Sequence, residues 1–350
     1  YGAGTEMSRY RNDTFRKVYT DTGLETDTYS TNLVFFKYSA FGQVSKSFID
    51  EKLSLSFGLR TDGNSYSPEM SNPFTQISPR FSASYSLTDI INLNFNTGRY
   101  YQLPPYTSLG LKDNSGNYIN KENGIKYIYA DHIVAGIEVI PEESLQFTLE
   151  SFYKHYNDYP FSVADQVPLS TKSAGYGIFG DEELVSTSTG RAYGLELMGR
   201  VRELKGLNAV FSYTFVRSEF KGTDEIYIPT AWDNRHLFSL TATKKLGETW
   251  NIGFKWRYVG GAPYTPYDVE KSSLIEAWDA TGQGYLDYTK YNTERLSAFN
   301  QLDLRVDKQF YFKKWSLMLY ADIQNILNFK AEQPDLLLQQ TDEAGVPLID

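Results

Sequence analysis

The stretch Leu53-Ser-Leu-Ser-Phe-Gly-Leu-Arg60 alternates strictly, with apolar residues at the odd positions and small or polar residues at the even positions. The same alternation recurs in Ile91-Asn-Leu-Asn-Phe-Asn96, Leu145-Gln-Phe-Thr-Leu-Glu150 and Leu302-Asp-Leu-Arg-Val-Asp307. A period of two gives a β-strand one apolar and one polar face, whereas an amphipathic helix needs apolar residues three and four positions apart. The pattern therefore predicts an all-β protein.

Short turns and long polar connections alternate along the chain. Short turns are predicted near Ile49-Asp-Glu51, Thr88-Asp89, Pro141-Glu-Glu143, Leu204-Lys-Gly206, Gly247-Glu248 and Lys313-Lys314. Long connections run from Leu103 to Ile125, from Pro160 to Ser188 and from Gly261 to Arg295. A soluble sandwich has no reason to collect all its long loops at one end. An outer-membrane barrel does, because its periplasmic turns are short and its extracellular loops are long.

Strand length supports a transmembrane antiparallel β-barrel. Soluble strands usually have about five or six residues, whereas a tilted membrane strand needs about nine to eleven. The alternation predicts about thirteen strands, several of them longer than that. Their predicted ranges are Thr5–Tyr19, Asn32–Phe48, Lys52–Asn64, Gln76–Leu87, Ile91–Gln102, Lys126–Ile140, Ser144–Tyr159, Thr189–Arg202, Leu207–Phe220, Arg235–Lys245, Trp250–Gly260, Ala298–Phe312 and Trp315–Asn328.

Composition agrees with a barrel. The 350 residues include 28 Tyr and 22 Phe but no Cys, and the mean hydropathy is −0.44. No apolar run approaches the roughly 18 residues of a spanning helix. In a barrel only every second residue meets lipid, and tyrosines suit the interfacial girdles. A tyrosine-rich extracellular β-protein is the alternative. The net charge of −9 argues against a nucleic-acid partner, which needs a basic surface.

An odd number of antiparallel strands cannot return the chain to its starting side, so we expect one further descending strand after residue 350. No signal peptide is visible at Tyr1, whose neighbours are Gly2, Ala3 and Gly4. The expectation is that residues 1–350 form one partial barrel domain, cut from a longer protein.

Several motifs, taken together, resemble the C-terminal half of the barrel of TonB-dependent outer-membrane receptors, particularly those of Bacteroidetes type. The motifs are Ser78-Pro-Arg-Phe-Ser-Ala-Ser-Tyr-Ser-Leu-Thr-Asp89, Leu93-Asn-Phe-Asn-Thr-Gly-Arg-Tyr-Tyr-Gln-Leu-Pro-Pro-Tyr106, Tyr193-Gly-Leu-Glu-Leu197, Asp233-Asn-Arg-His236 and Asp322-Ile-Gln-Asn-Ile-Leu-Asn328. The resemblance covers nearly the whole chain. Barrels of that family have about 22 strands, so this chain would hold a little over half, without the plug domain and the last strand.

The resemblance implies energy-coupled uptake of a bulky nutrient (siderophore, glycan, cobalamin or peptide) across the outer membrane of a Gram-negative bacterium. It also implies contact with outer-membrane lipid, coupling to TonB-ExbB-ExbD through the plug, and room for a surface lipoprotein over the mouth. Two alternatives stay open. One is a smaller porin-like channel of about fourteen strands, and the other is a secreted β-rich carbohydrate-binding protein.

Candidate ligand-binding residues lie at the predicted outer rim. Tyr101 and Tyr106 flank a Pro-Pro pair that ends a strand; they form either an aromatic girdle with a turn or a wall of a ligand vestibule. The other rim candidates, which could stack on a ligand or donate hydrogen bonds to it, are Trp232, Arg235, Tyr264, Tyr267 and Trp278.

Asp303, Arg305 and Asp307 alternate along one predicted strand and would face the lumen. They either hold the plug by hydrogen bonds or form a solvated, self-compensating face.

The sequence offers no support for an enzyme. Only three histidines are present, scattered over different predicted strands, and no motif suggests a metal, a cofactor or a catalytic nucleophile.

Overall fold

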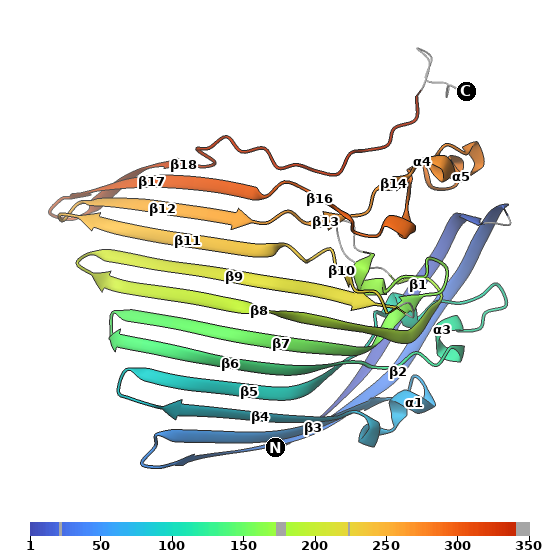
Figure 1. Ribbon diagram of the computed structural model, residues 1–350, viewed down its shortest axis with the longest axis horizontal. Coiled ribbons are helices and arrows are strands. Elements are labelled where there is room, and N and C mark those ends of the chain that lie inside the picture. Colours follow the sequence, from blue (N-terminus) through green and yellow to red (C-terminus); the bar gives the residue numbers. More distant parts are fainter. Residues whose placement is uncertain (21–22, 173–179, 223–224, 341–350) are drawn as a thin grey trace.

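A 14-stranded antiparallel sheet makes up most of the computed structural model, which describes residues 1–20, 23–172, 180–222 and 225–340. Thirteen long strands follow one another across it in chain order, as Figure 1 shows, and the short β10 (Ile228–Pro229) pairs with β9. The long strands are β1 (Gly2–Thr20), β2 (Gly23–Phe48), β3 (Leu53–Asn64), β4 (Ile77–Ser86), β5 (Ile91–Gln102), β6 (Ile128–Glu142), β7 (Leu145–Ser162), β8 (Leu184–Leu204), β9 (Leu207–Lys221), β11 (Arg235–Leu246), β12 (Trp250–Val259), β17 (Phe299–Tyr311) and β18 (Ser316–Ile323). The predicted all-β partial barrel is confirmed.

The two ends of the sheet differ as predicted. Tight turns gather at one end and the long connections at the other (Figure 1). Gly206 (φ 79°) and Gly247 (φ 60°) supply left-handed residues in two of the tight turns, a backbone conformation that glycine adopts without steric cost. We call the end with the long connections the mouth.

In the described parts of the mouth connections, all the elements besides β10 are short as well. These are α1 (Pro68–Ser71), η1 (Pro73–Thr75), α2 (Tyr106–Leu109), α3 (Ile119–Glu122), η2 (Leu169–Thr171), β13 (Pro263–Tyr264), β14 (Tyr267–Asp268), α4 (Val269–Ser272), α5 (Ile275–Thr281), β15 (Tyr285–Leu286), η3 (Tyr288–Lys290) and β16 (Glu294–Arg295). β13 pairs with β16, and β14 with β15. Within the described residues, no helix has the length and apolar character needed to cross a membrane.

Three strand boundaries differ clearly from the prediction. β2 begins at Gly23 rather than Asn32, because its ladder with β1 continues to the pair Thr20 and Gly23. Residues 23–31 of β2 are mostly polar on both faces, so this part of the strand gives no period-two signal. β8 begins at Leu184 rather than Thr189. β18 ends at Ile323 rather than Asn328; beyond it, the Asn325 backbone N–H donates to the side chain of Asp303 instead of to the ladder.

The strand register aligns the apolar residues on one face. Across β3, β4 and β5, Phe57 pairs with Phe81, and Ala83 pairs with Phe95. The belt continues through Leu149, which pairs with both Ile137 and Leu197. Phe57, Ile137, Leu149 and Leu197 are all exposed. An exposed apolar belt on a sheet this wide has the character of a lipid-facing wall.

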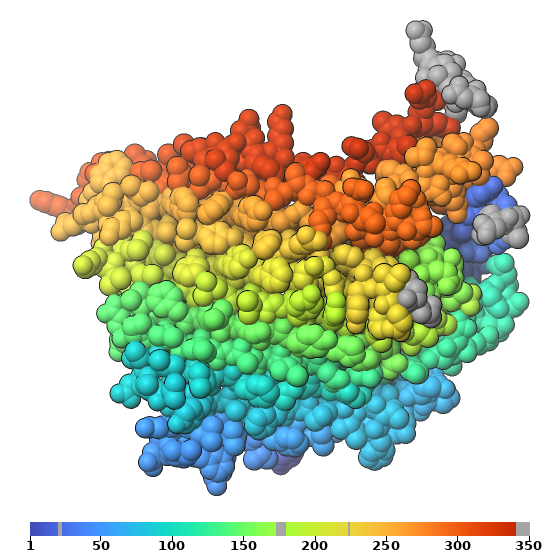
Figure 2. Space-filling view, in the orientation of Figure 1, coloured from blue at the N-terminus to red at the C-terminus, as the bar shows by residue number. Residues whose placement is uncertain are grey.

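The opposite face of the sheet is polar. Ser82 pairs with Ser56 on one side and with Asn96 on the other, and Lys255 pairs with Asp303. In Figure 2 successive colour bands run from blue to red, so the face in view is built from residues far apart in the sequence. The register thus makes one apolar and one polar face continuous across the wall.

The buried core is not in the wall but at the mouth. Side chains from β2, from the connections after β3, β5 and β7, and from the start of β8 pack into one cluster: Leu33, Phe35, Tyr66, Met70, Leu109, Ile125, Tyr127, Leu169 and Leu184. Met70, Leu109, Ile125 and Leu184 are fully buried. The mouth connections therefore form a packed layer, as a soluble domain does.

Candidate functional site

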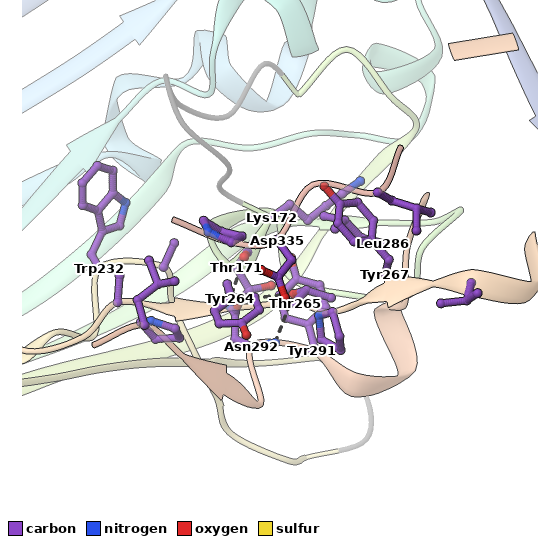
Figure 3. Close-up of a pocket in the computed structure, with 18 residues that line it drawn as sticks. Thr171, Lys172, Trp232, Tyr264, Thr265, Tyr267, Leu286, Tyr291, Asn292 and Asp335 are labelled. Carbon is purple, nitrogen blue, oxygen red and sulfur yellow. Dashed lines mark hydrogen bonds between the residues drawn. The ribbon is translucent and has the colours of Figure 1, made fainter. Parts of the chain in front are cut away.

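A cavity of about 600 Å³ lies at the mouth, between the connections that follow β7, β9, β12 and β18. Its volume is within the range typical of small-molecule sites, which are mostly apolar with a few placed polar groups. The lining fits that description, with Trp232, Tyr264, Tyr267, Val269, Leu286 and Tyr291 among its members. In Figure 3, Trp232 stands at one end of the cavity and Tyr267 with Leu286 at the other.

Asn292 holds the polar floor of this cavity together. Its Nδ2 donates to the carbonyl oxygens of Pro229 (2.7 Å) and Thr171 (3.2 Å). Its Oδ1 accepts from the Thr265 hydroxyl at 3.2 Å, and its backbone N–H donates to that hydroxyl at 3.1 Å. Asn292 has a left-handed backbone (φ 46°), which asparagine tolerates better than most residues. One buried amide thus joins three separate connections.

Lys172 contributes a buried charge beside the cavity. Its side chain is 11% exposed, and its ammonium group donates to Glu182 (2.6 Å) and to Asp165. Burial by itself would lower the pKa of Lys172, but Glu182 and Asp165 raise it more, so the net pKa lies above its ordinary value. The ammonium therefore stays charged and is neutralised by its two carboxylate partners.

Asp233 anchors the connection between β12 and β17 to the wall. The residue is fully buried, and its carboxylate accepts from Arg217 Nε (3.1 Å), Arg295 Nη2 (2.5 Å) and the Ser218 backbone N–H (2.8 Å). Arg217 also donates to Glu219. Such charge-assisted bonds are stronger than neutral ones. Arg295 follows Glu294, which pairs with Tyr264, so this ion network fixes one side of the cavity.

The structure brings together three of the predicted rim residues, Trp232, Tyr264 and Tyr267, as members of the cavity lining. Tyr106 lies elsewhere: its ring packs edge-on against Phe35 (centroids 5.4 Å apart) in the mouth core. Tyr101 packs against Tyr127 and lines a separate, charged cavity of about 350 Å³. Both tyrosines support the mouth layer.

The remaining two rim candidates also lie outside the cavity lining. Arg235 begins β11 with a left-handed backbone (φ 63°), and its Nε is 3.9 Å from an Asp233 carboxylate oxygen. Trp278 is in α5, which lies against β1 and β2. Their predicted contact with a ligand stays a prediction.

The three predicted lumen residues lie together on the polar face of β17. Arg305 donates to Asp307 (2.7 Å), its own neighbour on that face, and its guanidinium lies 4.2 Å from the centroid of the Tyr320 ring. Asp303 accepts from Gln301 Nε2 at 2.8 Å. The partners of Arg305 and Asp303 in these contacts all belong to the wall strands β17 and β18.

Sequence reasoning missed Thr171, Lys172, Tyr291, Asn292 and Asp335 as parts of the cavity. Nothing in their local sequence marks them, because they come from connections far apart in the chain. Asp233 did carry a signal, since it opens one of the quoted motifs. Among the described residues, no group of His, Cys, Asp or Glu is arranged to hold a metal ion.

The sheet topology, the apolar belt and the loop-built mouth define part of an outer-membrane β-barrel. The chain belongs to the family described as "TonB dependent receptor-like, beta-barrel", whose model matches residues 1–326. Members are receptors in the outer membrane of Gram-negative bacteria and not enzymes. No curated protein sequence matches the chain.

Solved structures of similar fold include the ferripyoverdine receptor of the outer membrane of Pseudomonas aeruginosa (TM-score 0.63, 12% identity, covering 93% of this chain and 41% of that chain). Others are the ferric-catecholate import receptor Fiu from Escherichia coli K12 (0.62, 13%, 94% and 48%) and the E. coli outer membrane transporter YddB (0.56, 16%, 99% and 48%). The chain spans less than half the length of each. At these identities the likeness shows the fold alone.

Proposed function

We propose that this chain forms part of the barrel wall and the ligand-binding mouth of a receptor that imports a bulky nutrient with energy from TonB. The observation that carries the proposal is the aromatic cavity of about 600 Å³ built from four mouth connections. Membership of the TonB-dependent receptor family supports it. Two proteins of similar fold are named for ferripyoverdine and ferric catecholates, which makes a ferric siderophore one candidate ligand class beside glycan, cobalamin and peptide.

The wall has a second proposed role. The polar face carrying Asp303, Arg305 and Asp307 would line the lumen and face a plug domain, through which TonB-ExbB-ExbD would act on the whole receptor. The cross-strand pair of Lys255 and Asp303 supports an ordered, charged lumen surface. A surface lipoprotein over the mouth stays a prediction.

The test is uptake by a strain that carries the whole receptor, compared with strains lacking the receptor or lacking TonB. The probes are a labelled ferric hydroxamate, a ferric catecholate, cobalamin, a neutral oligosaccharide and a short peptide. Accumulation of at least one probe should require both the receptor and TonB. Equal accumulation of every probe in all three strains would overturn the proposal.

A second measurement places the ligand. The double variant Tyr264→Ala/Tyr267→Ala removes two cavity rings, and we expect at least tenfold weaker uptake at limiting ligand, because each buried ring contact contributes roughly 1 kcal/mol. Phe74→Ala is the control, since Phe74 is aromatic and exposed at the mouth but lies outside the lining. Unchanged uptake by the double variant, at equal receptor level in the membrane, would remove the cavity as the ligand site.

A further inference from the structure

Carboxylates outnumber free cations around the mouth cavity. Among the described residues that line it, two side chains are charged, those of Lys172 and Asp335. Lys172 is already matched by Glu182 and Asp165. Asp335 has no such cationic partner among the ion pairs of the described residues.

Two further carboxylates lie on the same side of the cavity. Glu294 is exposed and pairs with Tyr264 across β13 and β16. The carboxylate of Glu332 accepts a hydrogen bond from the Ser297 backbone N–H. The pKa of Tyr264 is raised by burial and then by Glu294, Asp335 and Glu332, as expected of a phenol in a negative environment.

Two cationic side chains of the connection that carries Tyr264 are engaged elsewhere. Arg295, which follows Glu294, donates to the buried carboxylate of Asp233 and to the carbonyl oxygen of Gly261. Lys290 pairs with Asp287 at 2.9 Å. Neither is left to neutralise the carboxylates beside Tyr264.

We propose that this cavity selects a ligand group that is positively charged and has an apolar body, and that it disfavours anionic ligands. Trp232, Tyr264 and Tyr267 present aromatic faces, which attract ammonium and guanidinium groups. Asp335, Glu294 and Glu332 add the matching negative potential. An anionic ferric catecholate would meet the like charge of these carboxylates. The role of the cavity as the ligand site rests on the proposed function, but its charge preference does not.

The test needs no knowledge of the natural ligand. The chain contains no cysteine, so a single Leu286→Cys variant of the whole receptor places one thiol of this chain on the cavity lining. We would measure its rates of modification by a trimethylammonium, a sulfonate and a neutral methanethiosulfonate reagent. The receptor without an introduced cysteine gives the background rate of modification. Phe74→Cys gives the reference ratio, because Phe74 is at the mouth, 78% exposed and flanked by uncharged residues.

Clefts lined by charge of one sign raise the local concentration of counter-ions by about tenfold or more. The ratio of cationic to anionic rates at Leu286→Cys should therefore exceed the ratio at Phe74→Cys by about tenfold. Adding Glu294→Gln and Asp335→Asn should remove most of this excess, and so should high salt. An equal ratio at both thiols, or a preference for the sulfonate, would overturn the proposal.

Val269→Cys, also on the lining and 64% exposed, replaces Leu286→Cys if that variant does not reach the membrane. The charge inference and the proposed function fail separately. If no uptake depends on the receptor but the ratio of cationic to anionic rates is high at the cavity, only the transport proposal is rejected. If uptake depends on the receptor but the ratio is equal at both thiols, only the charge preference is rejected.

Discussion

The wall and the mouth of this molecule are stabilised in different ways. In the wall, backbone ladders satisfy the peptide groups while large apolar side chains such as Phe57 and Leu149 remain exposed on one face. In the mouth, Met70 and Leu109 are fully buried, and the buried carboxylate of Asp233 accepts from Arg217 of β9 and from Arg295 of the connection between β12 and β17. The exposed apolar face of the wall is suited to contact with lipid, whereas the mouth is packed like the core of a water-soluble domain. Substitutions should therefore act globally in the wall and locally at the mouth.

The largest effect should come from placing charge on the apolar face. Phe81→Arg puts a guanidinium in the belt, at a site that pairs with Phe57, and should cost about 2–4 kcal/mol if it lies near the membrane midplane. The neighbouring Ser82→Arg places the same side chain on the polar face, between Ser56 and Asn96. Unfolding of the receptor by denaturant in lipid vesicles measures both. Equal losses of stability would break the distinction between the faces.

Asp233→Asn should loosen the mouth and spare the wall. The amide cannot neutralise Arg217 and Arg295, and the loss of charged hydrogen bonds should cost about 1.5–3 kcal/mol locally. Limited proteolysis between residues 261 and 298 should accelerate while the unfolding midpoint of the barrel stays the same. The control is Asp50→Asn in an exposed tight turn at the opposite end of the sheet. A large fall in the barrel midpoint would show that mouth and wall unfold together.

A smaller and purely local effect is expected at Tyr106. Tyr106→Phe keeps the ring against Phe35 and loses one hydrogen bond, from the hydroxyl to Ser8 Oγ at 3.2 Å. The cost should be about 1 kcal/mol. Tyr106→Ala should cost more, because it empties part of the mouth core. Hydrogen exchange in the connection from Leu103 to Ile125 distinguishes the two variants, because it should be faster in Tyr106→Ala than in Tyr106→Phe. Equal exchange rates would mean that the ring does not pack as described.

The smallest effect should come from the charged side chains on the polar face of β17. Arg305→Gln removes an ion pair with Asp307 in which the arginine side chain is 39% exposed, so water screens the pair and barrel stability should hardly change. Denaturant unfolding again provides the measurement. A larger loss in the whole receptor would point to contact of Arg305 with another part of that protein.

The contrast between wall and mouth also explains which parts of the structure could be predicted. A wall strand such as β17 carries its own period-two signal, because lipid and lumen act on alternate residues. The upper part of β2 was missed since both of its faces there are polar, and no alternation marks them. The cavity combines Lys172, Trp232, Tyr264 and Asp335 from separate connections. Only their packing brings these residues together, so aromatic character predicted Trp232 and Tyr264 but nothing predicted Lys172 or Asp335.

The central claim is that the two faces of the sheet meet different solvents. A cysteine scan from Leu302 to Asp307 in the whole receptor, each thiol carrying a nitroxide label, tests this most directly. Accessibility to oxygen from the lipid phase should be high at Leu302, Leu304 and Val306. Accessibility to a water-soluble nickel chelate should be high at the intervening positions. A profile without alternation, or with the opposite phase, would contradict the account.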